Sequence, residues 1–234
     1  MDILNIGLYS DEGAEKEGII SFRNFFAHYN LNYVELNSED VNKGFVFKDK
    51  IQMLWIPGGW AVPYNEKIRA SGMQNIRDFV SKGNKLLGTC AGQYFISEKI
   101  VWEGVKYPYK LNIFKGTISG SLHEIAPWKK YIDTIVNLNK EHPANEGMPE
   151  KLVMVYYGGG EIHPDPNQPV SWLGHFEATA TGAIATFKYG NGTVLLMGPH
   201  AELGIASDGS LDTTGGPYSQ WEWLFNVVQW ISKV

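Results

Sequence analysis

The sequence is poorest in cysteine: Cys90 is the only one in 234 residues. A single thiol cannot form a disulfide within the chain, which excludes the disulfide-rich class of small secreted proteins. It also fits the reducing cytoplasm, where we expect this protein to be located. Because one cysteine and no His-x-x-x-His pair give no zinc site, we expect no metal, and we expect no cofactor.

An excess of positive charge and a long apolar run are also missing. Acidic residues outnumber basic residues by 25 to 20, the net charge is −5, and no cluster of Lys or Arg could follow a phosphate backbone. No apolar stretch reaches the roughly 18 residues of a membrane helix. The first residues, MDILNIGLYSDEG, lack the basic start and apolar core of a signal peptide and predict a strand instead. We therefore expect neither nucleic acid nor a membrane as a partner.

What the sequence does contain is an alternation of strand and helix patterns. Short apolar runs predict strands at 3–9, 33–36, 53–56 and 85–88. Apolar residues at helical spacing predict helices over about 16–29, about 64–82 and from Cys90 to about Lys99. This alternation indicates an α/β fold, with a mostly parallel central sheet and helices on both faces. Sites in such sheets form at the carboxyl ends of the strands.

The second half of the chain is less regular. Residues from about 101 to 180 are rich in Gly, Pro and Trp and show weak helical periodicity. The patterns predict a strand at 151–157, a hairpin at 183–197 around Gly190-Asn-Gly192, and a helix near 221–231. No linker, repeat or low-complexity tract divides the chain, so we expect residues 1–234 to form a single domain.

Cys90 lies in Gly88-Thr-Cys-Ala-Gly92, a G-x-C-x-G motif between a predicted strand and a predicted helix. This is the thiol form of the nucleophile elbow, in which a strand turns sharply into a helix and exposes a strained nucleophile. Small neighbours let the chain pass closely. The helix N-terminus favours a thiolate, and the Ala91 amide points to the place where an oxyanion would develop. A buried, structural cysteine is the alternative interpretation.

A nucleophilic thiol needs a base, and the base needs an orienting group. His200 follows the predicted strand 193–197, in Gly198-Pro-His-Ala-Glu202, at a strand carboxyl end. An acid two residues later, Glu202, can accept a hydrogen bond from the far ring nitrogen and hold the tautomer that a base requires. The other histidines are weaker candidates: we expect His28 and His142 at the surface, and Glu161 and His163 as further residues that could line the site.

Three motifs now stand in order along the chain: Ile56-Pro-Gly-Gly59, Gly88-Thr-Cys-Ala-Gly92 and Gly198-Pro-His-Ala-Glu202. Together they resemble the class I glutamine amidotransferase superfamily. The resemblance implies a flavodoxin-like sandwich with a Cys-His-Glu triad, in which Cys90 is the nucleophile, His200 the base and Glu202 the orienting group. It also implies an oxyanion hole formed by the amides of Gly59 and Ala91, with Gly58 in the same turn.

The chain is more closely similar to the biotin-protein ligase N-terminal domain family. The similarity rests on the Pro-Gly-Gly turn followed by Tyr64, on Cys90-Ala-Gly-x-Tyr-Phe95 and on the Tyr156-Tyr-x-Gly-Gly stretch. Members of that family stand alone in some bacteria and are fused to biotin ligase, as a non-ligase domain, in some eukaryotes. We find no Gly-rich biotinyl-adenylate motif, so the resemblance does not extend to a ligase half.

Two positions depart from the glutaminase pattern. Tyr94 stands where such sites usually carry glutamine, with Gln93 one residue earlier, and His200-Ala-Glu202 replaces His-Pro-Glu. The substrate is therefore left open. We expect Tyr94 and Trp60, which follows the Pro-Gly-Gly turn and could roof the crevice, to be in the substrate-binding part of the site.

Two functions from different classes follow from these residues. The first is a cysteine-dependent amidohydrolase or acyl-transfer enzyme that acts on a small-molecule amide or acyl substrate. The alternative is a non-catalytic small-molecule-binding or regulatory module on the same scaffold. A thiol redox sensor is a third idea, which lacks a second, resolving cysteine. The Trp and Tyr residues are numerous enough to cover the interface of a homo-oligomer or simply to fill the core.

Overall fold

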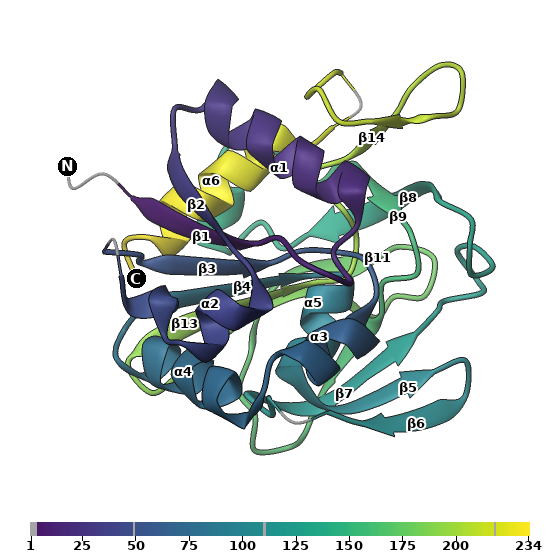
Figure 1. Ribbon diagram of the computed structural model, residues 1–234. Coiled ribbons are helices and arrows are strands. Elements are labelled where there is room, and N and C mark those ends of the chain that lie inside the picture. The colour runs from purple at the N-terminus through teal and green to yellow at the C-terminus, as the bar shows by residue number, and fades with distance from the viewer. Residues whose placement is uncertain (1–3, 49, 110, 218) are drawn as a thin grey trace.

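A computed structural model describes residues 4–48, 50–109, 111–217 and 219–234 (Figure 1). The helices are α1 (Lys16–His28), α2 (Ser38–Asn42), α3 (Ala61–Lys67), α4 (Ala70–Ser81), α5 (Ala91–Ile96) and α6 (Trp221–Ile231), with 3-10 turns at Phe45–Phe47 and Pro143–Asn145. The strands are β1 (Asn5–Tyr9), β2 (Asn32–Leu36), β3 (Met53–Ile56), β4 (Lys85–Thr89), β5 (Ser97–Trp102), β6 (Val105–Pro108), β7 (Phe114–Gly120), β8 (Ile132–Leu138), β9 (Lys151–Tyr156), β10 (Glu161–Pro164), β11 (Ser171–Phe176), β12 (Gly182–Tyr189), β13 (Gly192–Met197), β14 (Gly204–Ile205) and β15 (Leu211–Asp212).

Thirteen of these strands form one mixed sheet in the described part of the chain. Its first half has the order β2-β1-β3-β4-β13 and is parallel throughout. Antiparallel pairing then leads from β13 through β12 and β10 to β7, and β8, β9 and β11 branch from β12. The predicted α/β fold is confirmed, with the parallel pairing concentrated in the half that contains Cys90.

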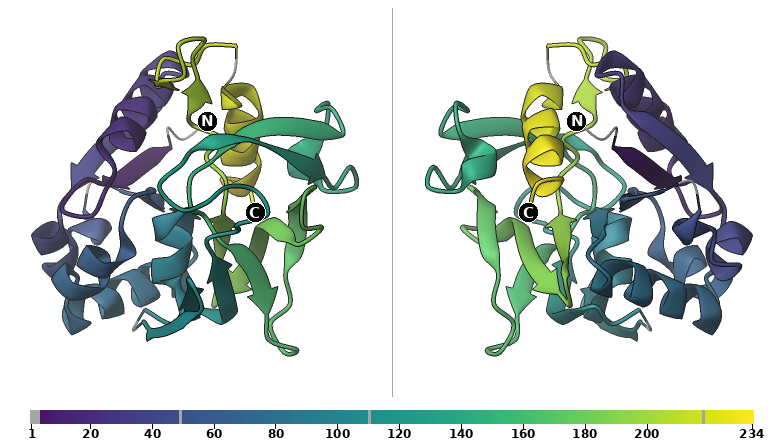
Figure 2. Two further views of the ribbon diagram at one scale, coloured as in Figure 1. Left: turned by 90° about the vertical axis from the view of Figure 1, so that its right-hand side faces the viewer. Right: turned by 90° about the vertical axis from the view of Figure 1, so that its left-hand side faces the viewer.

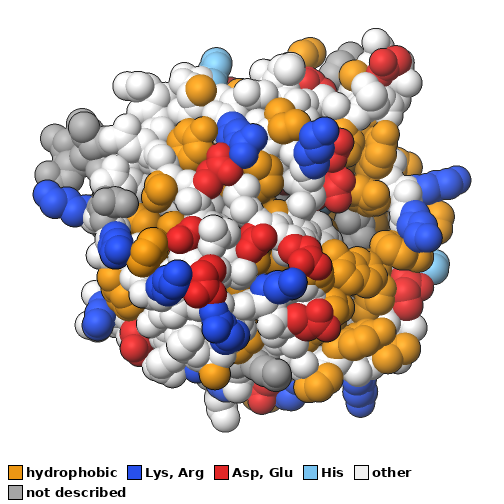
Figure 3. Space-filling model, in the orientation of Figure 1, with side chains coloured by type: hydrophobic (Ala, Val, Ile, Leu, Met, Phe, Trp, Pro, Cys, Tyr) orange, Lys and Arg blue, Asp and Glu red, His pale blue; other side chains and the backbone are white. Residues whose placement is uncertain are grey.

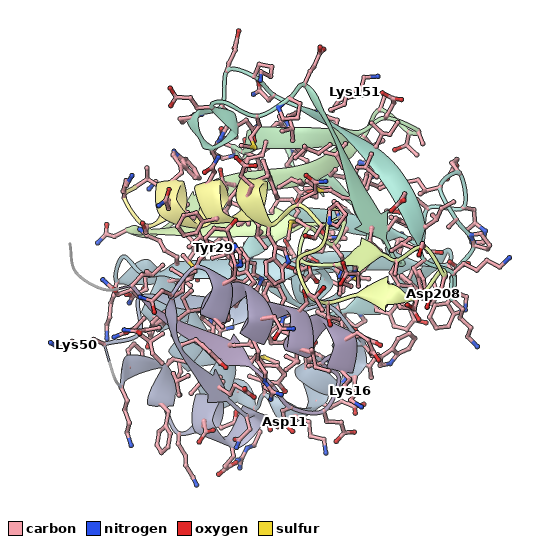
Figure 4. All side chains as sticks on the ribbon, turned by 90° about the horizontal axis from the view of Figure 1, so that it is seen from above. Asp11, Lys16, Tyr29, Lys50, Lys151 and Asp208 are labelled. Carbon is pink, nitrogen blue, oxygen red and sulfur yellow. The ribbon has the colours of Figure 1, made fainter. Side chains whose placement is uncertain are left out.

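Helices cover both faces of the parallel half, as predicted (Figures 1 and 2). On one face, α1 and α6 enclose a core with apolar side chains of β1 and β3, and Tyr29 at the end of α1 stacks on Phe225 of α6 with ring centroids 4.0 Å apart (Figure 4). On the other face, α2 to α5 pack over a second core. Among the described residues, no helix is long and apolar enough to cross a membrane.

The predicted helix over 64–82 is wrong as one element, because it is two helices broken at Ile68 and Arg69. Both residues have extended backbone angles, with ψ of 101° and 174°. The side chain of Asn42 bridges the break: its Nδ2 donates to Lys67 O at 3.0 Å, and its Oδ1 accepts from Arg69 N at 2.8 Å. A distant amide thus replaces two hydrogen bonds that a continuous helix would make internally.

The segment with weak periodicity folds mainly into strands. The helix predicted to reach Lys99 ends at Ile96, because Ser97–Trp102 pairs with β7 as strand β5. Strands β6 and β8 leave many side chains in water, so they lack the apolar alternation that would identify them from sequence. The predicted strand at 151–157, the hairpin around Gly190-Asn-Gly192 and the C-terminal helix are confirmed.

The aromatic core under α1 gives a direct test of this packing. Phe22 is fully buried and its ring centroid lies 4.5 Å from that of Trp55 on β3. We expect Phe22→Ala to lower the free energy of unfolding by about 3–5 kcal/mol, since it leaves a cavity between helix and sheet. Urea unfolding measures this, with Phe47→Ala as the control, because Phe47 is exposed and its loss is expected to cost less than about 1 kcal/mol. Equal losses in the two variants would contradict the assignment of this core.

Candidate active site

Cys90 stands at the point where β4 turns into α5. Its backbone has a φ of 48° and a ψ of −105°, a strained conformation for a residue with a side chain. The Cys90 amide donates to Met197 O at 2.8 Å, which ties the turn to the end of the adjacent strand β13. The nucleophile-elbow geometry expected for the G-x-C-x-G motif is therefore present.

The two glycines of the motif are required by close packing. A Cβ on Gly88 would lie 2.8 Å from the carbonyl carbon of Gly92 and 2.5 Å from Ile96 Cδ1. A Cβ on Gly92 would lie 2.1 Å from Ile56 O, at the end of β3. The short helix α5 can therefore lie against the strand ends only because these positions have no side chain.

His200 and Glu202 form a buried pair beyond the end of β13. Nδ1 of His200 lies 2.7 Å from Oε1 of Glu202, and the two residues are 2% and 0% exposed. The His200 amide donates to Val155 O at 2.7 Å, so β9 fixes the backbone of the histidine. Trp221 Nε1 donates to Glu202 O at 2.8 Å, and the Ser21 hydroxyl donates to the same carbonyl. The main chain of the pair is thus held by hydrogen bonds to three elements, β9, α6 and α1.

The charges around His200 favour its protonated form. Burial alone lowers the pKa of His200, but the negative charge of Glu202 and the neighbouring Cys90 outweigh it and hold the pKa well above its usual range. Cys90 and His200 line the same pocket. Nε2 of His200 nevertheless makes no hydrogen bond of standard geometry within the described residues, and the Cys90 sulfur lies 3.4 Å from Tyr157 O.

The Pro-Gly-Gly turn after β3 lies against the histidine. A Cβ on Gly58 would lie 2.4 Å from Cε1 of His200, so the turn and the ring are in direct contact. Gly59 has a φ of +136°, and a Cβ there would lie 2.0 Å from Gly13 O. The hydroxyl of Tyr64, the tyrosine that follows this turn, donates to Gly58 O at 3.1 Å and so helps to fix the turn.

The amides of Gly59 and Ala91 are available for a ligand. Around the turn, Trp60 N donates to Gly13 O and Glu15 N donates to Gly58 O, at 2.7 and 3.0 Å. Cys90 N is bonded to β13, whereas neither Gly59 N nor Ala91 N donates to a backbone carbonyl in the described part of the loop and elbow. Both residues line the pocket, and their role as an oxyanion hole stays a prediction.

A pocket of about 410 Å³ opens in front of Cys90 and His200. Seven aromatic side chains from both halves of the chain line it: Trp60, Tyr94, Trp102, Tyr107, Tyr109, Trp128 and Tyr157. Trp60 lies at the mouth and is 45% exposed, whereas Tyr94 is buried and donates from its hydroxyl to Gly158 O at 3.1 Å. Gln93 similarly donates to Gly160 O at 2.9 Å, so Gln93 and Tyr94, which mark the first departure from the glutaminase pattern, both bind the triple-glycine loop.

Several predicted positions lie elsewhere, and several lining residues were missed. Glu161 and His163 are bonded to each other at 2.7 Å on β10 and do not line this pocket. His28 is exposed as predicted, but the surface prediction for His142 is wrong: it is buried, and its ring lies 4.6 Å from that of Trp230. Pocket residues that carried no sequence signal are Glu15, Ile100, Trp102, Tyr107, Tyr109 and Trp128. No group of three or more metal-binding side chains occurs among the described residues.

Comparison with curated proteins finds two distant relatives. The chain is 25% identical over 227 residues to a biotin–protein ligase of Schizosaccharomyces pombe, covering 89% of this chain and 35% of the relative. It is 27% identical over 99 residues to an uncharacterized protein of Chlamydia muridarum, covering 41% of this chain and 38% of that protein. The matched part thus spans little more than a third of either relative.

Solved structures share the fold at low sequence identity. A glutamine amidotransferase matches with a TM-score of 0.66 at 13% identity, covering 98% of this chain and 99% of that chain. A glutamine amidotransferase from Thermotoga maritima matches with a TM-score of 0.57 at 14% identity, covering 88% of this chain and 79% of that one. These matches show a glutamine amidotransferase-like fold and nothing finer.

The profile of one protein family covers nearly the whole chain. It is the family described as "Biotin-protein ligase, N terminal", and it matches residues 4–217. The matched range contains the Pro-Gly-Gly turn, the Cys90 elbow and the His200–Glu202 pair. On this evidence the chain belongs to the biotin-protein ligase N-terminal domain family.

Proposed function

We propose that this chain is a cysteine-dependent amidohydrolase or acyl-transfer enzyme, with Cys90, His200 and Glu202 as its catalytic triad. The observation that carries the proposal is the meeting of two separate segments, the Cys90 elbow and the His200–Glu202 turn, at one pocket. A strained Cys90 at a strand end faces the same pocket as His200, and a buried carboxylate is bonded to the far side of the histidine. This is the arrangement of nucleophile, base and orienting acid that acyl transfer requires.

The reaction can be written from these groups. The Cys90 thiolate attacks the carbonyl carbon of the substrate, and the oxyanion that forms is stabilised by the amides of Gly59 and Ala91. Protonated His200 gives its proton to the leaving amine as the C–N bond breaks, which leaves a thioester on Cys90. His200 then takes a proton from an incoming water or amine, whose attack releases the acyl group and restores the thiolate.

The electrostatics of the site support the first step. Glu202 and Cys90 outweigh the effect of burial and hold the pKa of His200 well above its usual range, which favours protonated His200. In the structure the sulfur contacts Tyr157 O, and Nε2 of His200 has no partner of standard geometry among the described residues. Catalytic hydrogen bonds often tighten only when substrate is bound.

The second candidate is a binding or regulatory module without turnover. The contact between the Cys90 sulfur and Tyr157 O favours it, since the thiol is then satisfied outside the triad. The similarity to only part of a biotin–protein ligase is also compatible with a module that serves a larger protein. The two candidates differ in one measurable property, the reactivity of Cys90.

Alkylation of Cys90 by iodoacetamide across pH 6 to 9 separates these candidates. An enzyme is expected to react near pH 7 at close to its alkaline rate, and His200→Ala to lose about tenfold or more of that rate, because the thiolate then lacks its partner. His163→Ala is the matched control, since that exposed histidine is bonded only to Glu161 in the structure. If the alkylation rates of wild type and His200→Ala have the same pH profile and rise only in the alkaline range, the triad is contradicted and the binding module is favoured.

A further inference from the structure

Three tryptophans form one wall of the pocket. Trp60 follows the Pro-Gly-Gly turn, Trp102 ends β5 and Trp128 lies in the loop before β8. Their ring centroids are 5.6 to 6.3 Å apart, so each ring contacts the other two. Trp60 and Trp128 still expose 45% and 39% of their surface, and hydrophobic side chains gather on this side of the molecule, around α3, β5 and β6 (Figure 3). An aromatic surface of this kind at a pocket mouth is typical of a ligand-binding site.

Glu15 is the only Asp or Glu among the described residues that line the pocket, and no lysine or arginine is among them. It sits at the start of α1 and forms no ion pair within the described part of the chain. Burial, and after it a hydrogen bond and repulsion from Glu17, raise the pKa of Glu15. The positive charge of His200 acts in the opposite direction and lowers the pKa of Glu15. The cationic neighbour of Glu15 is therefore His200, and no lysine or arginine lies with it among the described lining residues.

The position of the proton between Cys90 and His200 does not change the net charge of the pocket. Moving it from sulfur to imidazole converts two neutral groups into a pair of opposite charges, so the carboxylates of Glu15 and Glu202 dominate the field in both states. Nε2 of His200, on a residue that is 2% exposed, lines the pocket with no hydrogen bond to a described residue. In protonated His200 this nitrogen is a donor, so it points to an acceptor on the ligand, such as a carbonyl oxygen, in a part of the molecule other than the ammonium group.

A cation of this chain already uses the aromatic wall. Nζ of Lys129 lies 5.2 Å from the ring centroid of Trp128, within the range of a cation–π contact. Lys129 is not among the residues that line the pocket, so this contact leaves the cavity free. The tryptophan cluster thus combines aromatic faces with a nearby unpaired acid, which are the elements that bind organic ammonium groups.

We propose that the pocket binds an organic cation, a primary or quaternary ammonium group attached to an apolar or aromatic body. The ammonium group would lie between the Trp60–Trp102–Trp128 wall and Glu15, and the rest of the molecule would extend toward Cys90. As a statement about substrate, this rests on the proposed function and specifies its amide or acyl compound as a cationic one. As a statement about binding, it stands without turnover. Anionic compounds would meet no lysine or arginine among the described lining residues, and the positive charge of His200 is balanced by Glu202.

Calorimetric titration of the Cys90→Ala variant tests the proposal without any reaction. The probes are benzyltrimethylammonium, neutral benzyl alcohol and anionic benzoate, which share one ring and differ in charge. We expect the ammonium probe to bind about tenfold more tightly than the alcohol, and benzoate to bind most weakly. Equal affinity for the three probes, or no ammonium binding at millimolar concentration, would overturn the proposal.

Two substitutions in the Cys90→Ala background assign the binding to this pocket. Glu15→Gln is expected to weaken ammonium binding about five- to tenfold and to leave the alcohol unchanged, whereas Glu150→Gln, at an exposed and distant acid, should change neither. Trp60→Leu should weaken ammonium binding several-fold, with the exposed Phe47→Leu as its control. An ammonium affinity that survives both pocket substitutions would place the cation elsewhere and overturn the proposal.

The outcome is independent of the test of the proposed function. Selective ammonium binding in a protein whose Cys90 has ordinary reactivity would support a cation-binding module and contradict the proposed enzymatic function. A reactive Cys90 in a pocket that binds the three probes equally would support the enzymatic function and contradict the proposal of a cationic substrate.

Discussion

Replacing Gly92 with alanine is expected to lower the free energy of unfolding by about 3 kcal/mol, the upper end of the usual cost of overpacking. The added methyl group would lie 2.1 Å from Ile56 O, which belongs to the backbone of the central strand β3. No rotation of a side chain can relieve this contact. Either α5 moves away from the sheet or the end of β3 bends, and both movements displace Cys90.

Gly18→Ala is the matched control for this prediction. Gly18 lies inside α1, and the nearest atoms to an added Cβ are 3.9 and 4.0 Å away, which is ordinary van der Waals contact. Alanine there should stabilise the protein by about 0.5–1 kcal/mol, because glycine is the poorer residue inside a helix. Urea unfolding of both variants gives the comparison, and a Gly92→Ala variant as stable as wild type would show that α5 is not pressed against β3.

The second large effect is expected at Glu202. Glu202→Ala leaves the imidazole of His200 buried without its partner and should cost about 3–5 kcal/mol of stability. Glu202→Gln keeps the shape and an oxygen that can accept from Nδ1, but it removes the negative charge. We expect this variant to fold, and alkylation of Cys90 at neutral pH to slow about tenfold for each unit by which the pKa of His200 falls. If Cys90 of the Glu202→Gln variant is alkylated as fast as in wild type, the orienting role of Glu202 is contradicted.

The same pair predicts how stability depends on pH. The pKa of His200 is raised in the folded protein above its usual value of 6.5, so protonation of His200 stabilises the fold. This contribution is complete below about pH 6.5 and is lost as the pH rises through the folded-state pKa. The difference in unfolding free energy between wild type and Glu202→Gln should therefore be largest below pH 6.5 and shrink toward alkaline pH. A difference that is constant with pH would contradict the assignment.

The sequence was most informative where local patterns and the sheet agree. Apolar strands that end in Pro-Gly-Gly and in the Cys90 motif predicted the parallel half of the sheet and a turn at each strand end. The place of His200 after the strand 193–197 predicted its position beside Cys90, since β13 pairs directly with β4. Local chemistry and strand order together were enough to indicate this part of the site.

The pocket wall could not be predicted in the same way. Trp102 and Trp128 are far from Trp60 in sequence, and only the pairing of β5 with β7 and the path of the following loop bring them together. Glu15 has no motif around it and reaches the pocket because the loop at Gly13 and Ala14 pairs with Gly59. The break between α3 and α4 is likewise decided by Asn42, a residue outside both helices. In each case a tertiary contact determines what the local sequence leaves open.

The proposed triad and the tryptophan wall come from different parts of the chain, and this has an evolutionary consequence. Cys90 and His200 follow β4 and β13, two strands that pair with each other inside the central sheet. Trp102 and Trp128 instead belong to the segment of short strands and loops between α5 and β9. Substitutions in that segment can change which molecule enters without moving the strand ends. Relatives that keep Cys90, His200 and Glu202 can therefore diverge in ligand preference, and the residues at positions equivalent to 60, 102 and 128 are the ones whose variation should follow that divergence.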